Sequence, residues 1–269
     1  MCGVELLGQV WAAHLLLFGA GAVAGTLNVV AGGGSFLTLP VMIFLGLPPT
    51  VANGTNRVAI LVQNVGAVWG FQRYGVMDRS WVRTAALPAL AGALIGAWVG
   101  IEIGDVLFRR ILAALMVVLS LWALWNPLRR RAAGDGGALA AGDGGALAID
   151  GRLARVGLGL GFFAAGVYGG FVQAGVGFLL LAVSTAGGLD LVRGNALKVL
   201  VVLCYTPVAL ALFGLAGKVD WTAGGTLAAG NLVGGLLGVR LTVLKGHAWV
   251  RRVVTAAIIA FAIKLWVST

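Results

Sequence analysis

The stretch Asn28-Val29-Val30-Ala31-Gly32-Gly33-Gly34-Ser35-Phe36 interrupts the first long apolar run of the chain. Three consecutive glycines are unfavourable inside a helix, because each costs about 1 kcal/mol relative to alanine. Irregular backbone at membrane depth persists only where it is buried in protein or lines a water-filled cavity. A helix that begins at Ser35 would direct its free N–H groups and the positive end of its dipole toward the glycines. The stretch therefore predicts a broken helix with an anion site inside a membrane.

The composition is that of an all-α polytopic membrane protein. Of the 269 residues, 60% are hydrophobic and only 10% are charged, and the mean hydropathy is +1.00. Soluble domains are nearer to about 25% charged, and a membrane β-barrel would show alternating rather than continuous apolar residues. The first apolar run lacks a basic leading region and continues into the glycine stretch, so a cleaved signal peptide is not expected.

Ten apolar segments are expected, five in each half of the chain. Eight of them reach roughly the 20 residues that a spanning helix requires. The two short ones occupy matching places in the halves, and each is expected either to span or to re-enter as part of a hairpin. The segments are 10–31, 35–46, 52–72, 81–101, 107–126, 153–172, 175–187, 195–214, 222–243 and 249–267.

The two halves match at a fixed spacing, which predicts an internal repeat. Residues 142 positions apart agree in the pairs Gly75 and Gly217, Asp78 and Asp220, Gly92 and Gly234, Gly96 and Gly238, and Arg109-Arg110 and Arg251-Arg252. At a spacing of 143, Ala31-Gly32-Gly33-Gly34 matches Ala174-Gly175-Val176-Gly177. We therefore expect a first transmembrane repeat over 1–126, a cytoplasmic linker over 127–152 and a second transmembrane repeat over 153–269.

The basic residues predict the orientation, because cytoplasmic loops are enriched in Lys and Arg. The linker holds Arg129-Arg130-Arg131 and the loop 73–83 is strongly basic, whereas the matching loop 218–220 is balanced. Equivalent loops on opposite sides indicate an inverted-topology repeat, with the linker inside and both termini outside. Orientation thereby accounts for the net charge of +10, and nucleic-acid binding is not expected.

Broken helices that meet near the membrane midplane, with their N-termini facing an anion, are typical of inverted-repeat transporters. The glycine breaks at 32–35 and 175–177 fit that arrangement, and Asn28 and Gln173 supply polar side chains beside them. The candidate site residues at these two tips are Asn28, Gly32, Gly33, Gly34, Ser35, Gln173, Gly175 and Gly177. The alternative is that the glycines only permit tight turns or close helix packing, as we expect for Gly92, Gly96, Gly230 and Gly234.

A polar run opens the third segment, with a counterpart in the second half. Asn53-Gly54-Thr55-Asn56-Arg57 corresponds to Gly194-Asn195-Ala196-Leu197-Lys198, so each half supplies one cation at a similar place. Cations within membrane segments usually face a functional cavity, where they would neutralise an anion. Alternatively, Asn53 or Thr55 is an N-cap and Arg57 extends to the membrane interface. We include Thr55, Asn56, Arg57, Asn195 and Lys198 among the candidate site residues.

Three further polar residues lie deeper in the same segments. Gln63 and Asn64 follow Arg57 by one and a half to two helical turns, and Tyr205 follows Lys198 by two. They either line a pore or form hydrogen bonds between helices. Acidic residues are absent from the apolar segments, and the sequence has no metal-ligand cluster and no Walker motif. An enzyme, a bound cofactor and an ATP-driven pump are therefore not expected.

These motifs resemble the sulfite exporter TauE/SafE family of permeases. The resemblance rests on Ala31-Gly32-Gly33-Gly34-Ser35 with Pro40, on Ala52-Asn53-Gly54-Thr55-Asn56-Arg57-Val58 with Gln63-Asn64, on Ala196-Leu197-Lys198-Val199 and on Gly217-Lys218-Val219-Asp220-Trp221. It implies secondary transport of small sulfur-containing or organic anions such as sulfite or sulfonates. The second tip departs from the triple-glycine pattern at Val176.

We therefore predict a multi-pass protein of the bacterial inner (cell) membrane that exports a small anion by alternating access. A proton or a sodium ion is a candidate coupling ion without an assigned site, and the oligomeric state stays open. Three alternatives are retained: a passive anion channel, a non-transporting membrane scaffold and, least favoured, a membrane enzyme.

Overall fold

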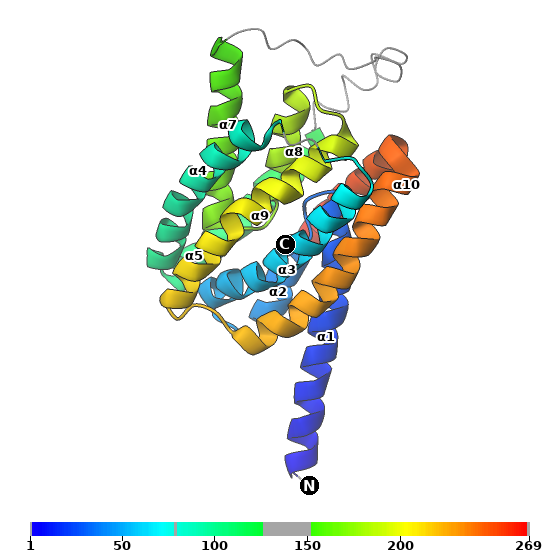
Figure 1. Ribbon diagram of the computed structural model, residues 1–269. Coiled ribbons are helices and arrows are strands. Elements are labelled where there is room, and N and C mark those ends of the chain that lie inside the picture. Colours follow the sequence, from blue (N-terminus) through cyan, green and yellow to red (C-terminus); the bar gives the residue numbers. More distant parts are fainter. Residues whose placement is uncertain (1, 78–79, 126–151, 268–269) are drawn as a thin grey trace.

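The computed structural model describes residues 2–77, 80–125 and 152–267, and within them the protein is a bundle of nine helices (Figure 1). The all-α polytopic architecture is thus confirmed. The predicted linker 127–152 lies outside the described residues except for its last one. The helices are α1 Cys2–Val30, α2 Ser35–Phe44, α3 Pro49–Arg73, α4 Val82–Glu102, α5 Asp105–Trp125, α7 Arg152–Phe171, α8 Val176–Ala186, α9 Leu191–Leu215 and α10 Trp221–Val267.

Within the described residues, four helices are both long and apolar enough to cross a membrane, fewer than the eight segments expected. They are Val10–Val30, Val82–Glu102, Leu191–Leu215 and Trp221–Lys245. The helix α3 has the required length at 25 residues, but its polar run lowers its hydropathy. The side chains of Asn53, Asn56, Arg57 and Asn64 are all buried. A helix can carry such residues at membrane depth because surrounding protein shields them.

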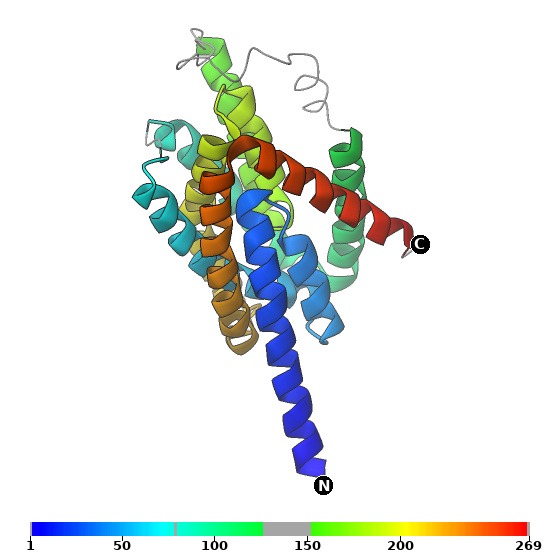
Figure 2. The ribbon, with the colours of Figure 1, turned by 90° about the vertical axis from the view of Figure 1, so that its right-hand side faces the viewer.

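The helix α10 corrects one predicted boundary. Two segments were expected at 222–243 and 249–267, but α10 runs unbroken for 47 residues. Gly246 is the only glycine or proline in the predicted gap between these segments, and one glycine costs a helix only about 1 kcal/mol. Figure 2 shows that the helix changes direction instead, with its first part upright beside α1 and its last part leading away.

The two short helices α2 and α8 appear where they were predicted. They have 10 and 11 residues, or about 15 Å of rise, which is half of the roughly 30 Å hydrocarbon core. In Figures 1 and 2, α2 turns back toward the end of the bundle where α1 begins, and α8 toward the end where α7 begins. Each therefore forms a hairpin with the helix before it.

Small residues hold the halves together across two helix pairs. A Cβ atom on Gly96 of α4 would lie 1.9 Å from the carbonyl oxygen of Val167 in α7. A Cβ atom on Gly234 of α10 would lie 2.0 Å from the carbonyl oxygen of Ala22 in α1. The backbones can approach this closely only at glycine, as expected for packing in lipid. Each half thus packs its fourth segment against the first helix of the other half.

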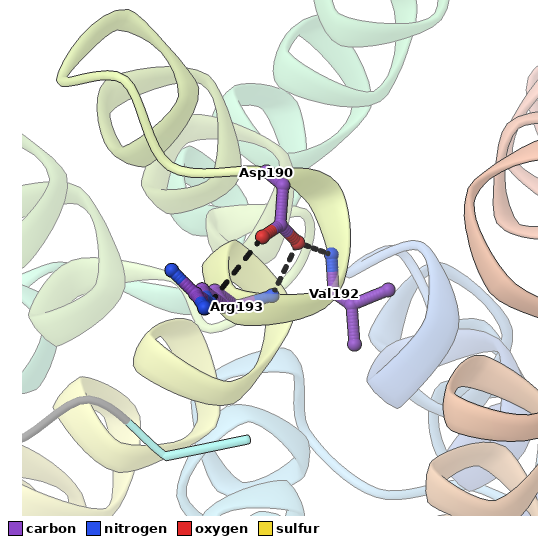
Figure 3. Close-up of polar contacts among 3 residues, drawn as sticks. All are labelled: Asp190, Val192 and Arg193. Atoms are coloured by element: carbon purple, nitrogen blue, oxygen red, sulfur yellow. Dashed lines mark hydrogen bonds and ion pairs between the residues drawn. The ribbon is translucent and has the colours of Figure 1, made fainter. Parts of the chain in front are cut away.

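The start of α9 is fixed by its N-cap, Asp190. One carboxylate oxygen accepts hydrogen bonds from the backbone N–H groups of Val192 at 2.8 Å and Arg193 at 2.9 Å, and the other lies 3.6 Å from the Arg193 guanidinium (Figure 3). A capping aspartate stabilises a helix by about 1 kcal/mol, whereas an exposed ion pair adds little. Asn195 and Lys198 lie further along α9, on its buried face.

Candidate functional site

The two glycine breaks touch each other. A Cβ atom on Gly32 would lie 2.6 Å from the Cα of Gly177, and one on Gly177 would lie 2.3 Å from the Cα of Gly32. Gly32 also has a φ of 94°, and Gly175, just before α8, has a φ of 76°, which glycine adopts at no steric cost. The tips therefore meet, and their direct contact leaves no space between them.

The Lys198 ammonium caps the broken end of α1. Its Nζ donates to the carbonyl oxygens of Asn28 at 2.9 Å and Val29 at 2.8 Å, and to the side-chain oxygen of Asn195 at 2.6 Å. The last four carbonyls of a helix lack partners within it and form the negative end of its dipole. A cation at this end therefore both satisfies the carbonyls and balances the dipole.

Asn195 completes this cap. Its side-chain amide donates to the carbonyl oxygen of Val30 at 3.1 Å. The carbonyl of Leu27 accepts from the backbone N–H groups of Ala31 at 2.7 Å and Gly32 at 3.1 Å. All four terminal carbonyls of α1 thus have partners, and those of residues 28–30 come from α9 in the other half of the chain.

Arg57 caps the broken end of α7, as Lys198 caps that of α1. The guanidinium donates to the carbonyl oxygens of Gly169, at 3.3 Å, and Gly170, and to the side-chain oxygen of Gln173 at 3.0 Å. It is fully buried and stacks 4.4 Å from the ring centroid of Phe213. The alternative in which Arg57 extends to the membrane interface is therefore wrong.

Asn53 completes the second cap, as Asn195 completes the first. Its side-chain amide donates to the carbonyl oxygen of Phe171 at 2.8 Å. Asn53 and Asn195 are 142 positions apart, the spacing of the sequence repeat. Neither residue is an N-cap, because α3 begins at Pro49 and α9 at Leu191. The two polar runs thus cap the two broken helices crosswise, each half closing the helix end of the other.

A small cavity lies beside the contact between the tips. Its volume is about 10 Å³, which is room for about one water molecule. Its walls come from α1, α3, α7–α8 and α9, and its lining residues are Asn28, Asn64, Gln173, Val176, Gly177, Lys198, Val199 and Val202. The N-terminal turn of α8 forms part of the wall, so the positive end of that helix dipole lies at the cavity.

Amide side chains connect the cavity to its surroundings. The Asn28 amide donates to the side-chain oxygen of Gln63 at 3.3 Å, and the Asn64 amide donates to the carbonyl of Ile60 at 2.8 Å. Gln173 accepts from Arg57, and its amide nitrogen lies 3.5 Å from the Tyr205 hydroxyl. Gln173 therefore joins the α7 cap to the cavity, and Gln63 and Tyr205 lie behind the lining residues.

The remaining candidates lie apart from the cavity. Ser35 and Asn56 are hydrogen-bonded to each other at 3.0 Å, and Asn56 also accepts from Thr38 at 2.7 Å. The Thr55 hydroxyl accepts from the backbone N–H of Asp220 at 2.9 Å and so secures the loop before α10. Gly34 packs against α1, where a Cβ atom would lie 2.0 Å from the carbonyl of Ala24, and Gly33 accepts from the N–H of Phe36. The first hairpin is therefore shaped by Gly33, Gly34, Ser35 and Asn56.

Two features, one in the cavity and one outside its lining, have weak or no signal in the sequence. Val199 and Val202 line the cavity, but a valine in an apolar helix carries no distinguishing signal. Asn231 in α10 is buried, and its side-chain oxygen has no hydrogen-bond partner among the described residues. An isolated asparagine in an apolar run is the signal that could have identified it. The described residues hold no group of three or more side chains of the metal-ligating kind.

Comparison with known proteins identifies the family of this chain. The family model described as "Sulfite exporter TauE/SafE" matches residues 17–265. A "Probable membrane transporter protein" of Haemophilus influenzae is 26% identical over 254 residues, covering 94% of this chain and 91% of the relative. The "Probable membrane transporter protein ORF9" of a Sinorhizobium species is 28% identical, and the match covers 94% of this chain and 92% of the relative. The "Probable membrane transporter protein YfcA" of Escherichia coli K12 is 27% identical, and the match covers 93% of this chain and 88% of the relative. No solved structure matches the chain.

Proposed function

Because the chain belongs to the sulfite exporter TauE/SafE family of membrane transporters, we propose that it exports a small sulfur-containing or organic anion, such as sulfite or a sulfonate. The family consists of transporters and not of enzymes. Transport is secondary, driven by an existing gradient, with a proton or sodium ion as the candidate coupling ion. The bacterial inner membrane is the proposed location.

The observation that carries this proposal is the cavity beside the touching tips. A small oxyanion needs hydrogen-bond donors and compensating positive charge in a site of low polarity. Lys198 supplies the charge, and Asn28, Asn64 and Gln173 supply amide groups around it. The N-terminal turn of α8 adds free backbone N–H groups and the positive end of its dipole. The donors thus converge on one point from both halves of the chain.

The two cations take different parts in this proposal. Lys198 lines the cavity, so we assign it to direct binding of the anion, for which one of its three N–H groups leaves its present acceptor. Arg57 contacts the end of α7 and the Gln173 side chain, so it acts as a positioning residue that holds Gln173 in place. Both were candidates for direct charge neutralisation, and only Lys198 retains that assignment.

The small size of the cavity supports an alternating-access mechanism. Room for about one water does not admit an oxyanion, so binding requires the Gly32 and Gly177 backbones to separate. Each broken helix end is held by the opposite half, through Asn53 and Arg57 or through Asn195 and Lys198. A rocking motion of one half against the other would carry these caps with it and open the cavity toward one side at a time.

An inverted repeat is the arrangement that this motion requires. Its support is the 142-residue spacing of Asn53 and Asn195 and the opposite positions of two matching loops. The connection from α3 to α4 and the connection from α9 to α10 lie at opposite ends of the bundle (Figures 1 and 2). With the positive-inside rule, the linker is cytoplasmic and both termini are outside.

Flux in proteoliposomes tests the proposal. Purified protein is reconstituted, and efflux of ³⁵S-sulfite is measured against its concentration, with and without unlabelled sulfite on the opposite side. A transporter gives saturable flux that is stimulated by substrate on the opposite side. Flux that never saturates and shows no such stimulation would indicate a channel, and the absence of flux for sulfite and sulfonates would indicate a scaffold.

A further inference from the structure

A long apolar groove lies on the surface of the bundle, away from the cavity. Its volume is about 530 Å³, and it runs between α3 and α10. Every lining residue is apolar or glycine: Leu61, Val62, Val65, Gly66, Trp69, Leu232 and Leu236. Val65 and Trp69 are exposed by 54% and 56%, so the groove faces the surroundings of the protein rather than its core.

Gly66 forms the floor of the groove. A Cβ atom at this position would lie 2.5 Å from the Cδ1 of Leu232, so α3 and α10 approach closely there. The larger side chains of Val65 and Trp69 stand on the α3 side, and Leu236 stands on the α10 side. The groove thus lies between apolar side chains of two neighbouring helices.

One end of the groove is basic. The Arg73 guanidinium lies 5.4 Å from the ring centroid of Trp69, a groove residue. A Cβ atom on Gly70 would lie 3.0 Å from the Val239 side chain, so Arg240 in α10 lies at the same end as Arg73. Both arginines are exposed. This end belongs to the loop side that the basic residues predict to be cytoplasmic.

The groove and its basic end together span about the thickness of one membrane leaflet. Leu61 and Arg73 are 12 residues apart in one helix, which corresponds to a rise of about 18 Å. Half of the hydrocarbon core is about 15 Å thick. The distance from Leu61 to the basic end therefore matches the thickness of one leaflet.

We propose that this groove binds one acyl chain of an anionic phospholipid whose phosphate pairs with Arg73 and Arg240. The apolar walls take the chain, and the arginines select an anionic headgroup, because a basic residue at the surface attracts anionic lipid. Arginine also forms bidentate hydrogen bonds with phosphate. The proposal concerns a site other than the substrate cavity and does not depend on which anion is transported.

A second copy of the chain is a poorer occupant. Two copies related by a twofold axis along the membrane normal would bring the same basic ends together, and like charges in contact oppose association. The groove is also concave on both copies, so neither supplies the ridge that would fill it. An anionic lipid would pair its phosphate with the arginines and fill the groove with its acyl chain.

Native mass spectrometry of the full-length protein tests this site. The protein is released from mixed micelles that contain equal amounts of phosphatidylglycerol and phosphatidylcholine with the same acyl chains, and the retained lipid is weighed. We expect about tenfold more retained phosphatidylglycerol. Arg73→Gln combined with Arg240→Gln should remove the preference, whereas Arg83→Gln, an exposed arginine of α4, should leave it unchanged.

A second variant tests the groove itself. Val65→Trp fills the groove from an exposed position, so the protein should keep its thermal stability and retain less of both lipids. Equal retention of the two lipids by the unaltered protein would overturn the proposal, as would an unchanged preference in the double arginine variant. Lipid-free dimers that Val65→Trp dissociates would instead assign the groove to a second copy.

Discussion

The Cα of Gly32 lies against the backbone of Gly177, so that a methyl group on Gly177 would come within 2.3 Å of it. Gly32 lies in the break between α1 and α2, and Gly177 lies in the first turn of α8. The two broken helices thus close on each other at one glycine-to-glycine contact. Opening this contact is the first requirement of the proposed transport cycle.

Gly177→Ala should obstruct this contact. We expect a loss of stability of about 1–3 kcal/mol from overpacking, seen as a fall in melting temperature of about 3–10 °C, together with slower sulfite flux. Gly225→Ala is the matched control, because Gly225 is also helical and has no atom within 4 Å of its Cβ position. Equal behaviour of the two variants would show that the glycine contact is unimportant.

Lys198→Met should weaken sulfite binding. The change removes the charge at the cavity and leaves the carbonyls of Asn28 and Val29 without their partner. A hydrogen bond to a charged group contributes about 1.5–3 kcal/mol, so the KM for sulfite should rise by about tenfold or more. Lys198→Arg keeps the charge and should retain part of the affinity. An unchanged KM in Lys198→Met would remove this residue from the binding site.

Arg57→Lys should affect transport differently from Lys198→Met. Lysine keeps the charge but loses the planar fork that reaches Gly169, Gly170 and Gln173 at once. We expect lower thermal stability and a lower maximal rate, with a KM that changes less than in Lys198→Met. A rise in KM as large as that of Lys198→Met would mean that Arg57 also contacts the anion.

The proposed inverted repeat predicts opposite accessibility for two matching positions. Tyr74 and Ala216 are the C-cap residues of α3 and α9, they are 142 positions apart, and both are exposed. Each is replaced by cysteine after Cys2 and Cys204 have been replaced by alanine, and intact cells are treated with a membrane-impermeant maleimide. Ala216→Cys should be labelled from outside and Tyr74→Cys only after lysis. Labelling of both from the same side would contradict the inverted repeat.

The contact between Thr50 and Asp105 predicts a pH-dependent stability. The backbone N–H and hydroxyl of Thr50 donate to one Asp105 carboxylate oxygen at 2.9 and 2.8 Å, and these bonds lower the pKa of the carboxyl group. A carboxylate with a lowered pKa stabilises the folded state above its unfolded pKa of about 3.9, and the stabilisation is lost as the pH falls through the folded pKa.

Asp105→Asn should therefore lower the melting temperature near neutral pH, by about 2–4 °C for a loss of roughly 1 kcal/mol at this exposed position. The difference from the unaltered protein should shrink as the pH falls below about 4. Melting curves between pH 3 and pH 7 measure it. A difference that stays constant over this range would exclude the carboxylate as its source.

Much of the fold follows from local patterns in the sequence. The glycine break at Gly32 and the lengths of the short segments predict α2 and α8, because periodicity and helix breakers are local properties. The continuation of α10 through Gly246 was not predicted, because one glycine marks a boundary in sequence but costs a packed helix little.

The site was less predictable than the fold. The polar runs identified Arg57 and Lys198, but not the helix ends that they cap. Those contacts join residues more than 110 positions apart, so they depend on how the halves pack. The direct contact of the tips and the valine walls of the cavity also depend on how the halves pack. Local sequence patterns do not reveal such packing.

Cryo-electron microscopy of the protein in sulfite tests the central claim most directly. The account predicts density for an oxyanion within hydrogen-bond distance of the Lys198 ammonium and the Gln173 amide, at the N-terminal turn of α8, with the backbones of Gly32 and Gly177 moved apart. Sulfite bound elsewhere while Gly32 and Gly177 remain in contact would contradict it.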